Sequence, residues 1–231
     1  MPTGCSMIGM MQKYPDRVFD VGIAEQHAVT FSAGLAAAGK RPFCNIYSSF
    51  LQRAYDQVIH DVCLQNLPVV FCLDRAGVVG EDGATHHGLY DMAFLKCLPN
   101  LIIAAPRNEI ELRQMLFTAM QTTDRPIVIR YPRGKGVVKQ WKMPFNKLEI
   151  GKAEIIQRGK HIALIGIGHP VNELIKAAAI LKEEGIKCTV VDARFIAPLD
   201  TLLFEEVLLK NQYIITLEDG CKSGGFGEAI L

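Results

Sequence analysis

The sequence contains 231 residues, of which 49% are hydrophobic, and it carries a formal net charge of +1. This length suffices for one large domain or two smaller ones with a buried core. The near-zero charge gives no reason to expect binding to nucleic acid or to an anionic membrane, and no apolar run approaches the roughly 20 residues that span a bilayer. The seven cysteines form no CxxC pair and most lie within apolar runs, which is typical of free thiols in a reducing compartment. We therefore expect a cytoplasmic protein.

The first informative stretch is Asp20–Ala28, with the sequence DVGIAEQHA, which places Glu25 at the start of an apolar helix rich in alanine and glycine. Small or apolar residues, Ile23, Ala24, Ala28 and Val29, surround Glu25 and permit close helix packing that would bury its carboxylate. A carboxylate in such surroundings must find a partner or take up a proton. Glu25 is therefore a candidate functional group, and the open question is whether its partner belongs to this chain.

In the first part of the chain, segments whose apolar residues have helical spacing alternate with short apolar runs that are typical of strands. Residues 48–65 carry an apolar stripe with helical spacing, and Asn108 and Glu111 have the spacing of a capping box that opens a second helix. The runs expected to form buried strands are residues 42–46, 68–73, 102–105 and 126–130. This alternation predicts an α/β domain over residues 1–134, in which a mostly parallel sheet is flanked by helices.

The composition and the apolar periodicity of the sequence change after this domain. Residues 135–150 contain several lysines and show no clear periodicity, so we predict a linker. A second unit of mostly parallel sheet and helices is expected over residues 151–231. Its expected strands are residues 162–165, 187–192 and 213–217, and its expected helices start near Val171 and Asp200. Because residues 223–231 look like the first turns of a further helix, we expect a truncated domain and a fragment of a longer protein.

Polar and aromatic side chains gather where three of the expected strands end. The loop 74–88, with the sequence DRAGVVGEDGATHHG, follows one strand and combines four glycines with charged residues and histidines. In a parallel α/β sheet, ligands bind at the carboxyl ends of strands, in loops of this kind. The candidate residues at these strand ends are Tyr47, Phe50, Arg53, Arg75, Asp82, His86 and Arg133.

Each of these residues also has a simpler interpretation. The glycine-rich loop could be a solvated surface loop, Phe50 a core residue, and Arg133 one partner of a surface salt bridge. Arg133 lies beside a glycine and follows the stiff Pro132, which also suits a clamp for phosphate or carboxylate. Three such clusters, together with a Glu25 that is expected to be buried, favour a binding site over these separate explanations.

Two glycine motifs resemble nucleotide or metal motifs but are incomplete. Gly166-Ile-Gly168 lies between an expected strand and helix, yet the third glycine of a dinucleotide motif is missing, so tight-turn glycines are the better interpretation. Gly80–Gly83 resembles the Gly-Asp-Gly that starts a diphosphate–magnesium motif, but Glu81 precedes the aspartate and Asn108 is better explained as a helix cap. We therefore predict no metal site within this chain.

Several segments of the chain resemble one enzyme family. They are Val21–Val29 (VGIAEQHAV), Ile46–Gln57 (IYSSFLQRAYDQ), Asp74–Gly80 (DRAGVVG), Asp82–His86 (DGATH) and Arg130–Gly134 (RYPRG). From about residue 3 to residue 231, the chain is similar to the 1-deoxy-D-xylulose-5-phosphate synthases, thiamine-diphosphate enzymes of the transketolase superfamily. The AEQH segment alone indicates only the superfamily, whereas the segment 46–57 together with the Asp-Gly-x-Thr-His loop indicates the synthases.

The resemblance implies a pyrimidine-binding domain followed by a C-terminal transketolase domain. It also implies that the family's first domain, which carries the diphosphate–magnesium motif, is absent. The family residue that matches Glu25 bonds a ring nitrogen of the cofactor aminopyrimidine and helps the cofactor to lose its thiazolium proton. The family residue that matches Phe50 stacks on the pyrimidine.

The resemblance further implies substrate contacts at the strand ends. The positions that match residues near the substrate phosphate are Tyr47, Arg75 and Arg133. Asp82 and His86 match positions that contact substrate and intermediate. His86 is also a candidate catalytic proton carrier, whereas His87 receives no role.

By this resemblance, the expected reaction is decarboxylation of pyruvate and transfer of its two-carbon unit to glyceraldehyde 3-phosphate. The product, 1-deoxy-D-xylulose 5-phosphate, is a precursor of isoprenoids, thiamine and pyridoxal. Thiamine diphosphate and Mg²⁺ are the expected cofactors, both anchored mainly by the absent first domain, and a homodimer is the expected assembly. The fragment alone is expected to be inactive. Two alternatives stay open: a β-type subunit of a 2-oxoacid dehydrogenase or split transketolase, and a non-catalytic dimerisation module.

Overall fold

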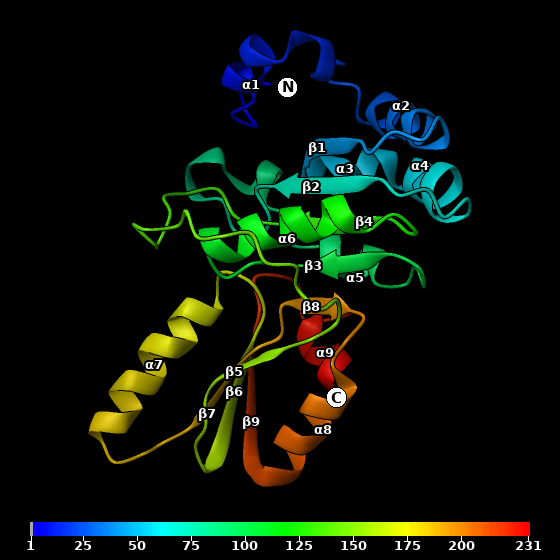
Figure 1. Ribbon diagram of the computed structural model, residues 1–231. Helices are drawn as coiled ribbons and strands as arrows, with labels where there is room; N and C mark the ends of the chain where they lie inside the picture. Colours follow the sequence, from blue (N-terminus) through cyan, green and yellow to red (C-terminus); the bar gives the residue numbers. More distant parts are fainter. Residues whose placement is uncertain (1) are drawn as a thin grey trace.

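The computed structural model describes residues 2–231, which form two sheets flanked by helices (Figure 1). The strands of the first sheet, in spatial order, are β1 (Phe43–Tyr47), β2 (Val70–Asp74), β4 (Ile127–Arg130), β3 (Ile102–Ala104) and β8 (Phe195–Ala197). The first four strands are parallel, and β8 is antiparallel to β3. The predicted α/β class with mostly parallel sheets is confirmed, whereas the sequence analysis does not predict β8.

Helices cover both faces of the first sheet because successive strand residues point to opposite sides. Phe71 and Leu73 of β2 belong to the same core cluster as residues of α2 (Glu25–Ala37). Val70 and Cys72 belong instead to the cluster beneath α6 (Glu109–Gln121). The continuous burial of β2 thus follows from its position between two helical layers.

The helix predicted at residues 48–65 is a continuous helical run whose pitch changes along its length. It consists of α3 (Ser48–Leu51), a 3₁₀ turn (Gln52–Ala54), α4 (Tyr55–Gln57) and a π-helical segment (Val58–Cys63). The apolar stripe that predicts it is buried at Leu51, Ala54, Val58 and Val62. Short helices and 3₁₀ turns complete this unit: α1 (Ile8–Lys13), α5 (Asp91–Leu95), Pro15–Arg17, Gly80–Asp82 and Ala84–His86.

Side-chain caps begin two of the helices. Asn108 Oδ1 accepts the Glu111 N–H at 3.0 Å, so the predicted cap at the start of α6 is confirmed. Asp200 Oδ1 accepts the Leu203 N–H at 3.3 Å at the start of α8 (Thr201–Lys210), which begins where the sequence places it.

The segment between the two units follows α6. In the described chain, residues 131–153 contain no helix or strand. They are nevertheless held, because Arg113 of α6 donates to the Met143 carbonyl at 3.2 Å and the Leu148 N–H donates to Thr118 Oγ1 at 2.8 Å. The predicted linker is therefore packed against the first unit.

The second sheet has the order β5 (Glu154–Gln157), β7 (Thr189–Asp192), β6 (His161–Gly166) and β9 (Asn211–Leu217). Here β5 is antiparallel to β7 and the other pairs are parallel. The helices α7 (Val171–Glu183) and α8 lie on opposite faces of this sheet, and α9 (Phe226–Ile230) follows β9 (Figure 1). At the turn before α7, Gly168 has φ +69°, and a Cβ there would lie 3.1 Å from Ala105 Cβ. The tight-turn interpretation is confirmed for Gly168, whereas it is wrong for Gly166, which is the last residue of β6.

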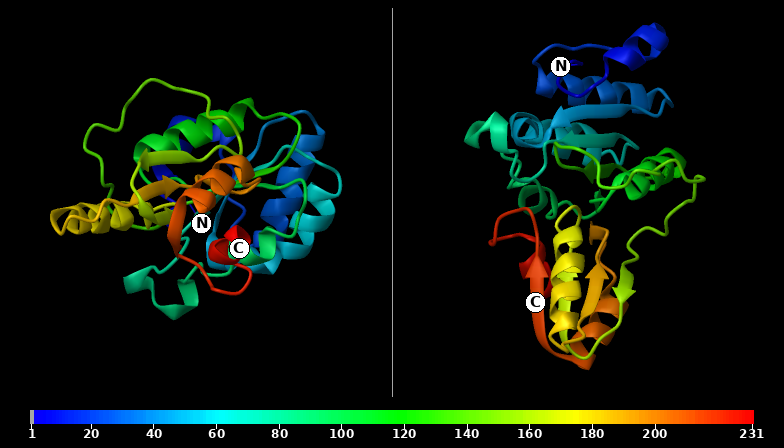
Figure 2. Two further views of the ribbon diagram at one scale, coloured as in Figure 1. Left: turned by 90° about the horizontal axis from the view of Figure 1, so that it is seen from below. Right: turned by 90° about the vertical axis from the view of Figure 1, so that its left-hand side faces the viewer.

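The two units lie end to end and share one core cluster (Figure 2). Strand β8 comes from the second half of the chain and pairs with β3 of the first sheet, with Ile103 opposite Ala197. Ile165 and Val191 of the second sheet belong to the same buried cluster as Phe71 of the first. No helix in residues 2–231 has the length and apolar character needed to cross a membrane.

Candidate active site

Glu25 is the first residue of α2, as the sequence pattern predicts. Its side chain is 10% exposed, and its Oε1 accepts a hydrogen bond from Arg53 Nη1 at 3.0 Å. The N-terminus of a helix also favours a negative charge at this position. The carboxylate therefore has a partner within the chain that the sequence analysis does not assign. The Arg53 side chain is 56% exposed, so the pair is open to solvent on one side.

A pocket opens beside Glu25. Its lining residues are Cys5, Val21, Gly22, Ala24, Glu25, Ala28, Asn45, Ile46, Tyr47 and Phe50. Most of this wall is apolar or aromatic, and Glu25 supplies a carboxylate to it. Such a combination suits a flat heterocycle with a ring nitrogen that can share a proton with the carboxylate.

Phe50 lies between this pocket and the glycine-rich loop. Its ring stacks on Tyr47 with centroids 5.3 Å apart, and the His86 ring centroid lies 5.1 Å away. The guanidinium carbon of Arg53 lies 4.6 Å from the Phe50 centroid, which is a cation–π contact. Arg53 thus contacts both Glu25 and Phe50, the two residues predicted to bind the cofactor.

Arg75 begins the glycine-rich loop and is buried against Tyr47. Its φ of +62° lies in the left-handed region, which is uncommon for a residue other than glycine. Its Nε donates to Asp82 Oδ2 at 2.8 Å and its Nη1 to Asp74 Oδ2 at 2.9 Å. Its guanidinium carbon lies 3.9 Å from the Tyr47 ring centroid. These contacts fix a cation at the carboxyl ends of β1 and β2.

Arg133 reaches the same aspartate from beyond the end of β4. Its Nη1 lies 3.4 Å from Asp82 Oδ1 and 3.5 Å from Glu81 Oε2. Asp82 therefore bridges Arg75 and Arg133. Both contacts of Arg133 use Nη1, and its side chain is 38% exposed.

The two adjacent histidines make different contacts. His86 Nδ1 lies 2.9 Å from Thr85 Oγ1, and its ring contacts Phe50. His87 Nδ1 accepts the Val79 N–H at 3.2 Å, so His87 stabilises the fold of the loop itself. The structure thus gives a local reason for His87, to which the sequence analysis assigns no role.

Burial and the charges around Arg75 together set the direction of the pKa shifts at this site. Burial raises the pKa of Asp74, although the charge of Arg75 opposes the shift. It likewise raises the pKa of Tyr47, again against the effect of Arg75. Burial lowers the pKa of Arg75, but the hydrogen bond to Asp82 and the charge of Asp74 outweigh it, so the net direction is upward. Arg75 is therefore a permanent cation beside Tyr47.

The structure brings the predicted site residues together. The residues linked by ring contacts or ion pairs are Tyr47, Phe50, Arg75, Asp82, His86 and Arg133, and Glu25 joins them through Arg53. This proximity is an observation, while the catalytic and binding roles of these residues stay predictions. Arg53 belongs to one of the strand-end clusters found in the sequence, but its link to Glu25 becomes visible only in three dimensions.

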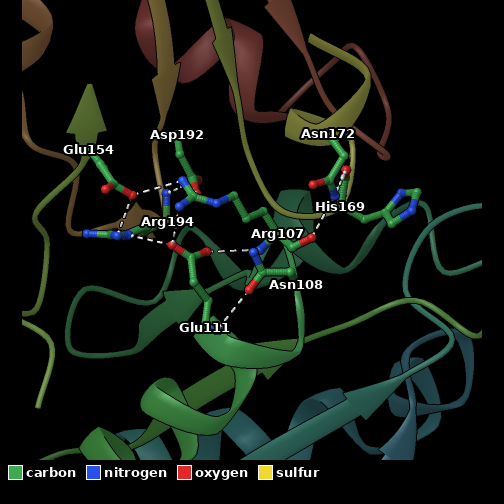
Figure 3. A network of polar contacts seen from close by, with 8 residues as sticks. All are labelled: Arg107, Asn108, Glu111, Glu154, His169, Asn172, Asp192 and Arg194. Carbon is green, nitrogen blue, oxygen red and sulfur yellow. Dashed lines mark hydrogen bonds and ion pairs between the residues drawn. The ribbon is translucent and has the colours of Figure 1, made fainter. Parts of the chain in front are cut away.

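A second group of carboxylates lies between the two units (Figure 3). One oxygen each of Glu111, Glu154 and Asp192 lie within 4.8 Å of one another, a spacing that could suit a metal ion. However, Arg107 Nη1 lies 2.8 Å from Glu154 Oε2 and 3.2 Å from Asp192 Oδ2. Arg194 Nε lies 2.9 Å from Glu111 Oε1. The two guanidinium groups already supply the positive charge that these carboxylates would otherwise take from a metal.

This network holds one more carboxylate than arginine, which has a consequence for Asp192. Its side chain is fully buried. Burial raises the pKa of Asp192 well above its ordinary value, and the nearby charge of Glu111 raises it further, while Arg107 opposes both. A proton on Asp192 would balance the charges of the network.

Two domain families match the sequence. Residues 2–137 match the pyrimidine binding domain of transketolase, and residues 151–231 match the transketolase C-terminal domain.

Curated relatives are similar to this chain over its whole length. The 1-deoxy-D-xylulose-5-phosphate synthase of Cytophaga hutchinsonii is 58% identical over 100% of this chain, which corresponds to 36% of that protein. The protein of the same name from Parabacteroides distasonis is 55% identical over 100% of this chain and 37% of its own length. The chain therefore spans little more than a third of the length of these relatives.

Among solved structures, one described as a split gene transketolase, inactive beta4 tetramer, matches with a TM-score of 0.84 and 28% identity. The match covers 95% of this chain and 70% of that chain. Both units of the present structure thus have counterparts in a known fold.

Proposed function

The chain belongs to the transketolase family, and from this premise we propose that it supplies the pyrimidine-binding side of the active site of a 1-deoxy-D-xylulose-5-phosphate synthase. One observation carries the proposal: the Glu25 carboxylate and the Phe50 ring line one pocket. Through Tyr47, this pocket adjoins a pair of arginines. A ring-binding carboxylate next to a cationic end suits a cofactor ring and a phosphorylated substrate.

The pocket fits the aminopyrimidine of thiamine diphosphate by the chemistry of its donors. When bound, thiamine diphosphate supplies a carbanion-stabilising centre for two-carbon transfer. Glu25 would share a proton with a ring nitrogen of the cofactor. Arg53 holds Oε1 of Glu25, which leaves Oε2 for this contact. Phe50 would support the face of the ring.

The arginines beyond Tyr47 suit the phosphate of the acceptor substrate. Arg75 and Arg133 both bond Asp82, so an incoming phosphate would compete with this carboxylate for their donors. Tyr47, whose ring lies against the Arg75 guanidinium, would add a neutral hydrogen bond from its hydroxyl. His86, whose ring contacts Phe50, is the proposed proton carrier between the cofactor and the substrate.

For the whole protein, the names of the relatives support a balanced reaction. Pyruvate loses carbon dioxide, its two-carbon unit forms a bond to the aldehyde carbon of glyceraldehyde 3-phosphate, and one proton is taken up. Mg²⁺ is the proposed second cofactor, held mainly outside the 231 residues, because the carboxylate group at Asp192 is engaged by arginines. We further propose a homodimer in the cytoplasm, as the resemblance implies.

A second candidate function follows from the solved structure described as a split gene transketolase. A chain with these two domains could serve as a separate subunit, as in a split transketolase or a 2-oxoacid dehydrogenase β-type chain. The description of that structure as an inactive tetramer also keeps a non-catalytic assembly module open. These alternatives differ in their donor and acceptor substrates, because only the synthase joins pyruvate to glyceraldehyde 3-phosphate.

The test is an assay on the product of the whole gene with thiamine diphosphate and Mg²⁺. We expect pyruvate and glyceraldehyde 3-phosphate together to yield 1-deoxy-D-xylulose 5-phosphate and carbon dioxide in equal amounts. The 231-residue chain alone is the second sample, for which no turnover is expected. A whole protein that transfers two-carbon units only from ketose phosphates, or only to an acyl carrier, would support a rival assignment and refute this one.

A further inference from the structure

A carboxylate of the second unit reaches the base of the glycine-rich loop in the first unit. Asp219 follows β9 by two residues, and its Oδ1 accepts the Val78 N–H at 3.0 Å. Gly77, next to Val78, has φ +79°, and a Cβ built there would lie 1.7 Å from Asp219 Oδ2. Only glycine fits between this carboxylate and the loop.

The contact falls where the loop is closed. Gly77 and Gly88 exchange two backbone hydrogen bonds, each of 2.8 Å, and so form the neck of the loop. Asp82 and His86 lie on the segment between them, and Arg75 precedes the neck by two residues. The neck therefore fixes both ends of the segment that carries Asp82 and His86.

A buried arginine ties the same neck to the sheet. Arg130 is 4% exposed, and its Nη2 donates to the Asp219 carbonyl at 2.9 Å and to the Gly88 carbonyl at 3.4 Å. Its Nε bonds Asp91 Oδ2 at 2.9 Å, and Asp91 also accepts from Ser48 Oγ at 2.9 Å. Because Ser48 directly follows Tyr47, the neck, Asp219 and the end of β1 are held in one buried network.

We propose that Asp219 is a positioning residue for substrate binding: from the C-terminal domain, it fixes the neck of the loop that carries Asp82 and His86. In this role it acts on the loop through the Val78 N–H. That the loop binds substrate rests on the proposed function. That Asp219 holds the loop in place does not depend on it. The inference goes beyond that function because it gives the C-terminal domain a part in setting the affinity for the phosphorylated acceptor.

Two variants of Asp219 and one control separate this role from a general effect on domain packing. Asp219→Asn keeps an oxygen that can accept the Val78 N–H, whereas Asp219→Ala removes it. The control is Glu154→Ala, which removes contacts to Arg107 and Arg194 at the domain boundary without touching the loop. All three are made in the product of the whole gene.

Hydrogen exchange at the Val78 amide and steady-state kinetics are the two readouts. For Asp219→Ala we expect Val78 exchange to be at least about tenfold faster, as local opening of the loop becomes easier. We also expect the KM for glyceraldehyde 3-phosphate to rise by about tenfold, the scale of a lost hydrogen bond to a charged acceptor, with kcat changed by less than about threefold. Asp219→Asn and Glu154→Ala should stay near the wild-type values in both measurements.

Several results would overturn the proposal. They are unchanged Val78 exchange in Asp219→Ala, an unchanged KM in an active Asp219→Ala enzyme, and the same changes in Glu154→Ala. If the wild-type protein shows no synthase activity, the proposed function fails. Val78 exchange then still decides whether Asp219 holds the loop.

Discussion

The ion pair between Glu25 and Arg53 should contribute a measurable coupling free energy to folding. Replacing Arg53 with alanine leaves a carboxylate that is 10% exposed without the guanidinium that now lies 3.0 Å away. Leaving a buried charged group unpaired costs about 1–3 kcal/mol, and exposed ion pairs contribute about 0.2–1 kcal/mol. Because the Arg53 side chain is 56% exposed, solvent screening places the expected coupling at about 1 kcal/mol.

A double-mutant cycle measures this coupling. Arg53→Ala should destabilise the chain by about 1–2 kcal/mol, and adding Glu25→Gln should restore about 1 kcal/mol, since the neutral amide no longer needs the cation. Urea unfolding followed by far-ultraviolet circular dichroism gives the four free energies of unfolding.

A matched pair on the surface provides the control. Lys176 Nζ lies 2.8 Å from Glu173 Oε1, but these side chains are 68% and 55% exposed. Their coupling should be clearly smaller than that of the Glu25–Arg53 pair, because solvent screens both charges. If the Glu25–Arg53 coupling is no larger than that of the control pair, the carboxylate does not depend on Arg53 and the reasoning is refuted.

The remaining predictions concern one of the two arginines of the candidate site and the network between the two units. Arg133→Ala should raise the KM for glyceraldehyde 3-phosphate by about tenfold or more with a smaller change in kcat, and an unchanged KM in steady-state kinetics would argue against the clamp. Because the pKa of Asp192 is raised above its ordinary 3.8, the folded chain binds this proton more tightly than the unfolded chain, so the Asp192 contribution to stability falls as pH rises above that value. The stability of Asp192→Asn relative to wild type should therefore increase with pH in urea unfolding, and a constant difference would contradict the raised pKa.

Much of the fold can be predicted from the sequence, because helices and buried strands each require a characteristic spacing of apolar residues. The strands β1, β2, β3 and β4 appear as short apolar runs, and Asn108 marks the start of α6 through a local hydrogen bond. The strand β8 does not appear, because its three residues owe their pairing to β3 of the other unit. The strand β5 is an edge strand whose residues are only partly buried, so its apolar pattern is weak.

The site residues that directly follow a strand can be predicted from the sequence. The ends of β1, β2 and β4 bring Tyr47, Arg75 and Arg133 together because parallel strands share one edge. Partnerships across long separations are not encoded locally. The link from Arg53 to Glu25 crosses 28 positions, and that from Asp219 to Val78 crosses 141. Applying the same strand-end rule to β9 would have singled out Asp219.

The central claim, that Glu25 activates the cofactor from this pocket, is tested most directly by the kcat of Glu25→Gln in the product of the whole gene. The amide keeps the size of the side chain and needs no cation, so the fold should be retained, which the unfolding measurements check independently. We predict that kcat for formation of 1-deoxy-D-xylulose 5-phosphate falls by on the order of 10²–10⁴-fold, the scale of a lost general acid–base group. A kcat near that of the wild type would contradict the account.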